Sequence, residues 1–402
     1  MNICLCITNF KSDLVEAISK TAVDAARALN ENADCVLYTP GEIASDTWQG
    51  EQRPKHVSFA PDRDYHSKVR VFRNIVDLGR HLRASPGKFD IVHFHVGNLL
   101  ELFLIRLFVP NLGAVKIATV WQPYLGFGEF FRLPWIFGRQ WPAVAHHYLF
   151  NSWLHVPLFM FGAGYFDRIC VHTRHQRRQL SFVPDGKART IVNGVAAPEA
   201  PPPRKSGPPS VLYIGHATAV KGLDTLLSAL GRARDRAPFR ATLALTAFQN
   251  VDVKKLLREN GLEDRVTIKG HVDVFDEMHR HGVLVVPHKT SLGTSCYPNI
   301  VLEALSAGIP VVASETNVLA EIIEDRVTGF LVPPGDVRAL ERVLVELFNG
   351  SADAESMSER QQAAFRERFT LERYVAGNLQ MYEEALNTTS AKIETGISGQ
   401  HS

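Results

Sequence analysis

SLGTSCYPNIVLEALSAGIPVVAS, residues 291–314, carries the strongest structural signal in the chain. Pro298 suits the first turn of a helix, where a missing backbone N–H costs nothing. Gly308 suits the position just after a helix end, where the backbone commonly takes a positive φ. The apolar residues 310–313 that follow predict a strand. The segment therefore predicts a loop, a helix over residues 298–307 and a buried strand in direct succession.

A helix that opens from such a loop offers backbone N–H groups and the positive end of its dipole, which suits a diphosphate. Glu303 lies about one turn further into this helix, where it could accept hydrogen bonds from ribose hydroxyls. A plain helix with a surface glutamate would leave the same pattern. This segment alone therefore leaves both interpretations open.

A second segment, YIGHATAVKGL at residues 213–223, has the same character. Gly215 at the end of a predicted strand lets the backbone turn tightly beside a ligand. Lys221 before the next helix can neutralise phosphate charge, although a solvated lysine is the alternative. Both segments follow strands of one predicted parallel sheet, at the edge where such folds bind ligands. Their combination favours a nucleotide-phosphate site.

Short apolar runs alternate with amphipathic segments along most of the 402 residues. This alternation is typical of βαβ units, and the length fits two domains. The sequence AAPEAPPPRKSGPPS at residues 196–210 separates the two series and predicts a linker. We therefore expect an α/β protein with domains over residues 1–195 and 211–369, a helix near 370–387 that packs back on the first domain, and a disordered tail over 388–402.

The composition restricts the partners and the cellular location that we expect for the protein. The formal net charge is +2, and the basic residues are scattered without a nucleic-acid-binding motif, so no nucleic-acid partner is expected. The five cysteines are odd in number and lack metal-ligand spacing, which favours reduced thiols. Residues 1–10 lack the basic start and small-residue site of a signal peptide. These features predict a cytoplasmic protein.

At this point the chain resembles the retaining glycosyltransferases of family 4, whose two Rossmann-like domains face each other across a cleft in the GT-B fold. The resemblance spans nearly the whole chain. It rests on the opening strand and helix and on residues 90–95, 191–195, 215–222, 298–314, 329–335 and 369–374.

The resemblance implies transfer of a sugar from a nucleotide diphosphate sugar, with retention of configuration and without a metal or another cofactor. Lys221 and Glu303 would be the catalytic residues: Lys221 would contact the diphosphate, and Glu303 would hold the ribose. The implied donor-binding set is Gly215, His216, Lys221, Ser295, Pro298, Asn299, Ile300 and Glu303. The implied acceptor or sugar contacts are His95, Trp121 and Gln122. His93 and His95 share one strand face, and two structural histidines are the alternative there.

Four positions depart from the family pattern. Ser295 stands where the family places the first of two glutamates, and His216 stands where it places an arginine. Trp121 and Gln122 replace a histidine that faces the donor sugar. Residues 8–11, TNFK, replace a glycine-rich turn. The residues that would bind the nucleotide therefore match the family pattern better than those that would contact the sugar.

The segment from Trp121 to Phe166 contains four of the five tryptophans, and residues 140–166 contain no Asp, Glu, Lys or Arg. Three histidines and two prolines interrupt residues 140–166, which argues against a membrane-spanning helix. Aromatic residues with flanking arginines suit a membrane interface or a lipid-linked acceptor. We therefore expect either a peripheral membrane contact through residues 121–178 or a well-packed core.

The sequence as a whole predicts a hexosyltransferase that acts on a cell-envelope or polysaccharide acceptor at the inner face of a membrane. A non-catalytic GT-B protein that binds a nucleotide is the first alternative, because of Ser295, His216 and Trp121. A sugar-nucleotide epimerase is the second.

Overall fold

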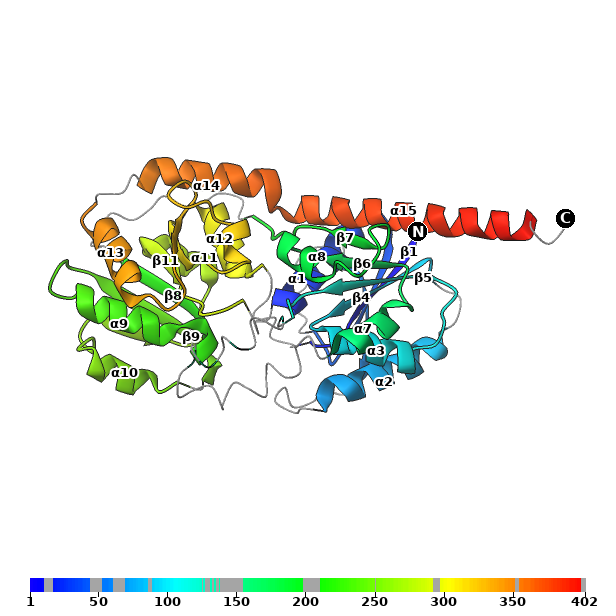
Figure 1. Ribbon diagram of the computed structural model, residues 1–402, viewed down its shortest axis with the longest axis horizontal. Helices are drawn as coiled ribbons and strands as arrows, with labels where there is room; N and C mark the ends of the chain where they lie inside the picture. Colours follow the sequence, from blue (N-terminus) through cyan, green and yellow to red (C-terminus); the bar gives the residue numbers. More distant parts are fainter. Residues whose placement is uncertain are drawn as a thin grey trace. The chain divides into compact units, whose positions relative to one another are not determined.

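The computed structural model describes residues 1–10, 17–43, 53–60, 69–85, 89–124, 155–197, 210–249, 251–291, 297–350 and 354–398, with Gly126, Phe131, Pro134 and Phe137. The chain divides into two compact units (Figure 1). Unit 1 comprises Met1–Phe130, His146–Gly194 and Leu371–Ser402. Unit 2 comprises Phe131–Ala145 and Val195–Thr370. The sequence predicts an unbroken first domain, whereas this division gives residues 131–145 to unit 2.

The described residues of unit 1 form a seven-stranded parallel sheet in the order β3-β2-β1-β4-β5-β6-β7. Its strands are β1 (Asn2–Ile7), β2 (Asp34–Pro40), β3 (Lys55–Ala60), β4 (Ile91–Val96), β5 (Val115–Val120), β6 (Arg168–Val171) and β7 (Ala188–Thr190). Its helices are α1 (Ala17–Leu29), α2 (Arg70–Arg83), α3 (Leu99–Phe108), α7 (Val156–Ala163), α8 (Arg174–Gln179) and α15 (Leu371–Ser398).

Two hydrophobic cores cover the two faces of this sheet. Side chains alternate along β1, so that Ile3 and Leu5 join the core with α1 and α15, whereas Cys4 and Cys6 join the core with α2, α3 and α7. A sheet buried on both faces explains why its strands are apolar almost throughout.

The described residues of unit 2 form a six-stranded parallel sheet in the order β10-β9-β8-β11-β12-β13. Its strands are β8 (Ser210–Ala217), β9 (Arg240–Gln249), β10 (Val266–Lys269), β11 (Val283–Val286), β12 (Val311–Ser314) and β13 (Phe330–Val332). Its helices are η4 (Ala219–Lys221), α9 (Leu223–Ala233), α10 (Val253–Glu259), α11 (Val274–Arg280), α12 (Asn299–Ala307), η5 (Leu319–Glu321), α13 (Val337–Phe348) and α14 (Ala354–Arg368). Both sheets thus have the doubly wound order of a dinucleotide-binding fold.

The last helix returns to the first unit. Tyr374, Val375 and Tyr382 of α15 are buried in the core that contains α1. The helix continues to Ser398, so residues 388–398 are helical where the sequence predicts disorder. One reason is that the Arg168 guanidinium donates a hydrogen bond to the Thr388 hydroxyl, at 3.0 Å. The predicted linker lies largely outside the described residues.

Candidate functional site

Two glycines shape the end of β8 and the loop after it. Gly215 and Gly222 have φ values of 152° and 68°, which side-chain-bearing residues rarely adopt. A Cβ atom on Gly222 would lie 1.8 Å from the Pro287 carbonyl oxygen. Only glycine therefore allows this loop to touch the chain that leaves β11. Lys221 lies just before Gly222, at the end of the short helix η4.

Helix α12 begins and ends as the sequence predicts. Pro298 is its N-cap residue and makes no side-chain cap hydrogen bond. Asn299 and Ile300 form the start of the first turn, where backbone N–H groups have no partner within the helix. Gly308 ends the helix with a φ of 66°. The N-terminus of α12 therefore has the geometry that suits an anion.

The two predicted segments lie at one place in the sheet of unit 2. Strands β8 and β11 are parallel neighbours, and the strand order reverses between them. The Lys289 backbone N–H donates to the Val220 carbonyl at 2.9 Å, which joins the two loops directly. In doubly wound folds this reversal point is where ligands bind, at the carboxyl ends of the strands. The structure thus brings Lys221 and the loop before α12 to the same edge.

Lys221, His288 and Lys289 lie at this edge. Burial, and then the charge of Lys221, holds the pKa of His288 well below its ordinary value. Lys289 donates to the Asp224 carboxylate at 2.6 Å and is itself mostly buried. The sequence interpretation missed Lys289 because its place beside Val220 depends on the pairing of β8 with β11. Its position directly after an apolar strand is the signal that could have found it.

His216 lies near the end of β8, where two contacts hold it in place. Its Nδ1 atom bonds with the Thr246 hydroxyl at the end of β9, and its carbonyl accepts from the Tyr213 hydroxyl at 2.7 Å. These contacts fix the orientation of an imidazole where the resembling family has an arginine. Since a histidine carries a positive charge less reliably than an arginine does, the sequence predicts a weaker phosphate contact at this position.

Glu303 is nearly completely buried, with 3% of its surface exposed. It follows the start of α12 by about one turn, as predicted, and its carbonyl accepts from the Ser306 hydroxyl at 2.7 Å. The low exposure differs from the surface glutamate of the alternative interpretation. Ser295 lies outside the described residues, so the altered sugar contact there stays a prediction.

His95 and Trp121 lie in the interior of unit 1. Trp121 has no exposed surface, and its indole N–H donates to His95 Nδ1 at 3.2 Å. His95 is 1% exposed, and burial lowers its pKa to about 3. This burial argues against the predicted side-chain contact of both residues with a sugar or acceptor. The reason is α15, which covers this end of the sheet.

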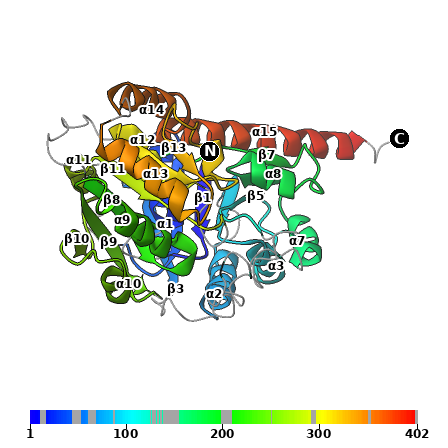
Figure 2. The same cartoon turned by 60° about the vertical axis from the view of Figure 1, so that its left-hand side comes forward.

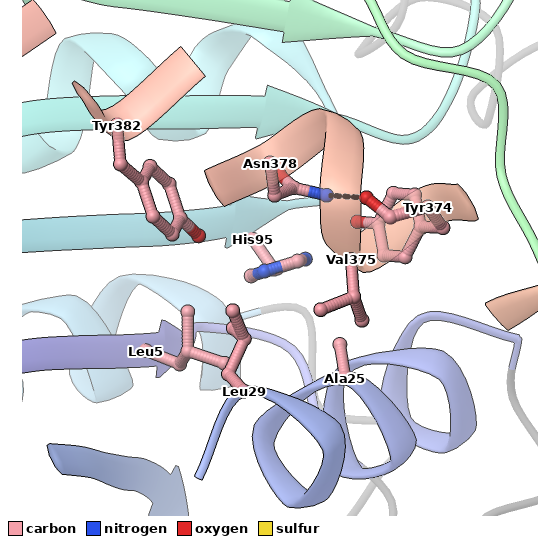
Figure 3. Close-up of a pocket in the computed structure, with 8 residues that line it drawn as sticks. All are labelled: Leu5, Ala25, Leu29, His95, Tyr374, Val375, Asn378 and Tyr382. Carbon is pink, nitrogen blue, oxygen red and sulfur yellow. Dashed lines mark hydrogen bonds between the residues drawn. The ribbon is translucent and has the colours of Figure 1, made fainter. Parts of the chain in front are cut away.

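A small pocket beside His95 is lined from β1, α1 and α15 (Figure 3). Three buried polar atoms in it have no hydrogen-bond partner among the described residues: His95 Nε2, the Tyr374 hydroxyl and Asn378 Oδ1. His93 on the same strand face is satisfied by the Tyr382 hydroxyl at 2.6 Å and by Thr119 at 2.7 Å. The predicted shared face of His93 and His95 is therefore confirmed, with their rings 4.5 Å apart.

Gln122 and Glu101 lie at the corresponding edge of the sheet of unit 1. The Gln122 backbone N–H donates to the Gly97 carbonyl at 3.1 Å. Glu101 accepts from the Gly97 N–H and from the Asn98 side chain, both at 3.1 Å, and also from the Thr8 hydroxyl. Burial raises its pKa to about 7 despite these bonds. The sequence interpretation missed Glu101, which holds together the loops after β1 and β4.

No group of three or more His, Cys, Asp or Glu side chains with metal-binding geometry occurs in the described part of the chain. The described helices also include none long and apolar enough to cross a bilayer. In unit 2 the N-terminus of α12 and Lys221 lie at the same sheet edge, an arrangement that suits a diphosphate.

Solved structures share this architecture. Sucrose-phosphate synthase from Thermosynechococcus elongatus superposes with a TM-score of 0.75 at 17% identity, over 96% of this chain and all of the other. Anabaena HepE, solved in complex with UDP-glucose, has a TM-score of 0.67 at 14% identity, over 96% of this chain and all of the other. The fold is therefore of the GT-B class, with two Rossmann-like units.

Within that class, residues 208–350 match the family described as Glycosyl transferases group 1. The phosphatidyl-myo-inositol mannosyltransferase of Mycobacterium leprae is 26% identical over 84% of this chain and 81% of its own length. The amylovoran biosynthesis glycosyltransferase AmsK of Erwinia amylovora is 29% identical over 36% of this chain. That match spans only 37% of AmsK, and a match to the alpha-D-kanosaminyltransferase of Streptomyces kanamyceticus spans 39% of that enzyme. The resemblance inferred from the motifs is confirmed.

Proposed function

We propose that the protein transfers a hexose from a nucleoside diphosphate sugar to a cell-envelope or polysaccharide acceptor, with retention of configuration. The observation that carries the proposal is the junction of the loop after β8 with the loop before α12, at the reversal point of the sheet in unit 2. Relatives named for mannosyl transfer to phosphatidyl-myo-inositol and for amylovoran biosynthesis support both the reaction and the class of acceptor.

In this mechanism unit 2 binds the diphosphate at the N-terminus of α12. Lys221 and the backbone N–H groups of Asn299 and Ile300 stabilise the negative charge that develops as the sugar leaves. Gly215 lets the backbone approach the ligand, His216 donates to a phosphate, and Glu303 holds the ribose. The charge is met by protein donors, so no metal or other cofactor takes part.

The acceptor in this proposal is lipid-linked, and the protein acts in the cytoplasm at the inner face of the membrane. The aromatic composition of residues 121–178 supports the membrane contact. The name of the phosphatidyl-myo-inositol mannosyltransferase supports a lipid acceptor.

A second candidate is a GT-B protein that binds a nucleotide without turnover. The burial of His95 and Trp121 favours it, because these side chains would have to become accessible to contact a sugar or an acceptor. An epimerase would need an acid and a base free to act at one site, whereas Lys289 and Asp224 at the reversal point are bonded to each other.

Product analysis with a panel of UDP-, GDP- and ADP-hexoses separates these functions. Transfer to a polyprenyl-phosphate-linked or phosphoinositide acceptor supports the first proposal. Saturable nucleotide binding with neither transfer nor hydrolysis of any donor would favour the binding protein, and recovery of an isomerised donor would favour the epimerase. Thermal-shift screening against nucleoside diphosphates identifies the base first, since ligand at 100 times its Kd stabilises by about 2.7 kcal/mol.

A further inference from the structure

Exposed apolar side chains concentrate on one surface of unit 1, formed by α2, α3 and α7. These helices lie side by side in both views (Figures 1 and 2). Among the described residues, nine large hydrophobic side chains are exposed, and six of them belong to this surface. They are Val69, Phe72, Leu107, Leu158, Met160 and Phe161, with 37% to 55% of their surfaces exposed. We call this surface the α2–α3–α7 face.

Helix α7 shows why this exposure is unusual. Its sequence, VPLFMFGA, contains no polar or charged side chain. Phe159, Gly162 and Ala163 face the core, whereas Leu158, Met160 and Phe161 face outward. A surface helix of a globular protein normally carries polar residues on its outer side. The outer side of α7 is instead as apolar as its inner side.

The three helices form one continuous platform because they touch at their backbones. A Cβ atom on Gly79 of α2 would lie 2.2 Å from the Phe108 carbonyl oxygen of α3. A Cβ atom on Gly162 of α7 would lie 2.7 Å from the Phe103 backbone nitrogen of α3. Phe103 and Phe161 rings also meet at 5.9 Å. The three helices therefore pack directly against one another, and each contributes exposed apolar residues.

The charge on this platform is positive. Exposed Arg73, Arg80 and Arg83 lie on α2. The only acidic residues in the three described helices are Asp77, which pairs with Arg80 at 3.0 Å, and Glu101, which is buried. Exposed aromatic and aliphatic groups beside unpaired positive charge are the features that bind anionic lipid headgroups.

A second copy of the chain fits this face less well. In a twofold dimer the same surface meets itself, so the arginines of α2 would face arginines. An anionic bilayer instead gains from the same charge and accepts the apolar side chains at the boundary between headgroups and acyl chains.

We propose that the α2–α3–α7 face docks unit 1 on an anionic bilayer. The inference rests on the membrane contact in the proposed function and changes its location. The sequence places that contact at residues 121–178, whereas the structure places α2 and α3, which precede this range, beside α7. Leu158, Met160 and Leu107 enter the membrane boundary, and the arginines of α2 contact the headgroups.

Flotation of the full chain tests the proposal, with phosphatidylcholine vesicles that contain either no phosphatidylglycerol or about one quarter of it. We expect strong binding to the anionic vesicles only. The double variant Leu158→Glu/Met160→Glu should weaken binding at least about tenfold, and Leu107→Glu provides an independent variant on α3. Arg73→Gln and Arg83→Gln should each weaken binding about five-fold, the equivalent of about 1 kcal/mol.

Ile268→Glu is the matched control, since Ile268 is 43% exposed on β10 of unit 2. It should bind vesicles like the unmodified chain. Failure of the unmodified chain to float with anionic vesicles would overturn the proposal, as would equal loss in the control. A dimer in sedimentation that Leu158→Glu/Met160→Glu abolishes, without vesicle binding, would also overturn it and assign the face to a second copy. Sugar transfer to a soluble acceptor is measured separately, so its absence bears only on the proposed function.

Discussion

Lys221 is the residue from which a phosphate contact is most directly expected, because the glycine after it holds the loop against β11. We predict that Lys221→Ala weakens binding of the cognate nucleoside diphosphate by about 1.5 to 3 kcal/mol, the range for a charged hydrogen bond. Calorimetry measures the loss. Lys254→Ala is the matched control, since Lys254 is an exposed lysine on α10 of the same unit.

Glu303 needs a gentler substitution because it is buried. We predict that Glu303→Gln keeps the fold and weakens nucleotide binding, while Glu263→Gln at an exposed position of unit 2 changes nothing. Melting curves establish that the variant is folded before calorimetry is done. Unchanged affinity in both Lys221→Ala and a folded Glu303→Gln would refute the donor site assigned to unit 2.

Features of the candidate site that depend on neighbouring residues could be predicted from the sequence, whereas features that depend on residues far along the chain could not. Gly308 and Pro298 act on the backbone of their own segment, so the limits of α12 follow from residue type alone. The burial of Trp121 depends on α15, more than 200 positions later in the chain. The sequence around Trp121 does not indicate that α15 covers this residue. The predicted sugar contact of Trp121 therefore depends on the family resemblance alone.

The loop after β8 requires glycine at position 222. We predict that Gly222→Ala lowers the free energy of unfolding by about 1 to 3 kcal/mol from the positive φ, with a further cost of about 1 to 3 kcal/mol from the clash with Pro287. Gly335→Ala separates the two effects, since Gly335 also has a positive φ, 76°, but no atom within 4 Å of an added Cβ. Equal thermal shifts in the two variants would show that the close approach to Pro287 is absent in solution.

The packing of α15 on the sheet encloses three neutral histidines, which gives unit 1 a pH dependence. Burial lowers the pKa of His172 to about 4, that of His95 to about 3, and that of His93 well below its ordinary value. Below the unfolded pKa of about 6.5, the unfolded chain binds protons that the folded chain does not. Stability is therefore complete above this pH and falls as the pH decreases from 6.5 toward 4.

Each histidine should contribute a slope of up to about 1.4 kcal/mol per pH unit in this window. Melting curves between pH 8 and pH 5 measure the total. His172→Gln should lower Tm at pH 8 and make the decline below pH 6.5 shallower. A constant Tm from pH 7 to pH 5 would contradict the buried, neutral state of the three rings.

Considered as a whole, the molecule has a discontinuous first unit and a nearly continuous second one. The chain leaves unit 1 at Gly194 and returns at Leu371, and near these positions Val195 pairs with Thr370. Helix α15 contributes Tyr374, Met381 and Tyr382 to the core of unit 1. The doubly wound order of each sheet was predictable from alternating strands and helices, whereas the depth to which α15 is buried was not.

We predict that truncation after Thr370 removes the cooperative melting of unit 1 and leaves that of unit 2. Loss of the α15 side chains uncovers the sheet face that contains Ile3 and Leu5. Calorimetry should show one transition lost, and nucleoside diphosphate binding by unit 2 should persist. Truncation after Ser390, beyond the contacts of Thr388 and Thr389, should leave both transitions in place.

The return of α15 also determines when each unit can be finished during synthesis on the ribosome. Strand β1 is translated long before α15, so one face of its sheet is fully covered only after α15 has emerged. Unit 2 is translated completely before that point, so it can fold while unit 1 is still incomplete. A nascent chain that stops early therefore exposes the apolar face of unit 1, so chaperones and proteases can distinguish unfinished molecules from finished ones by that surface alone.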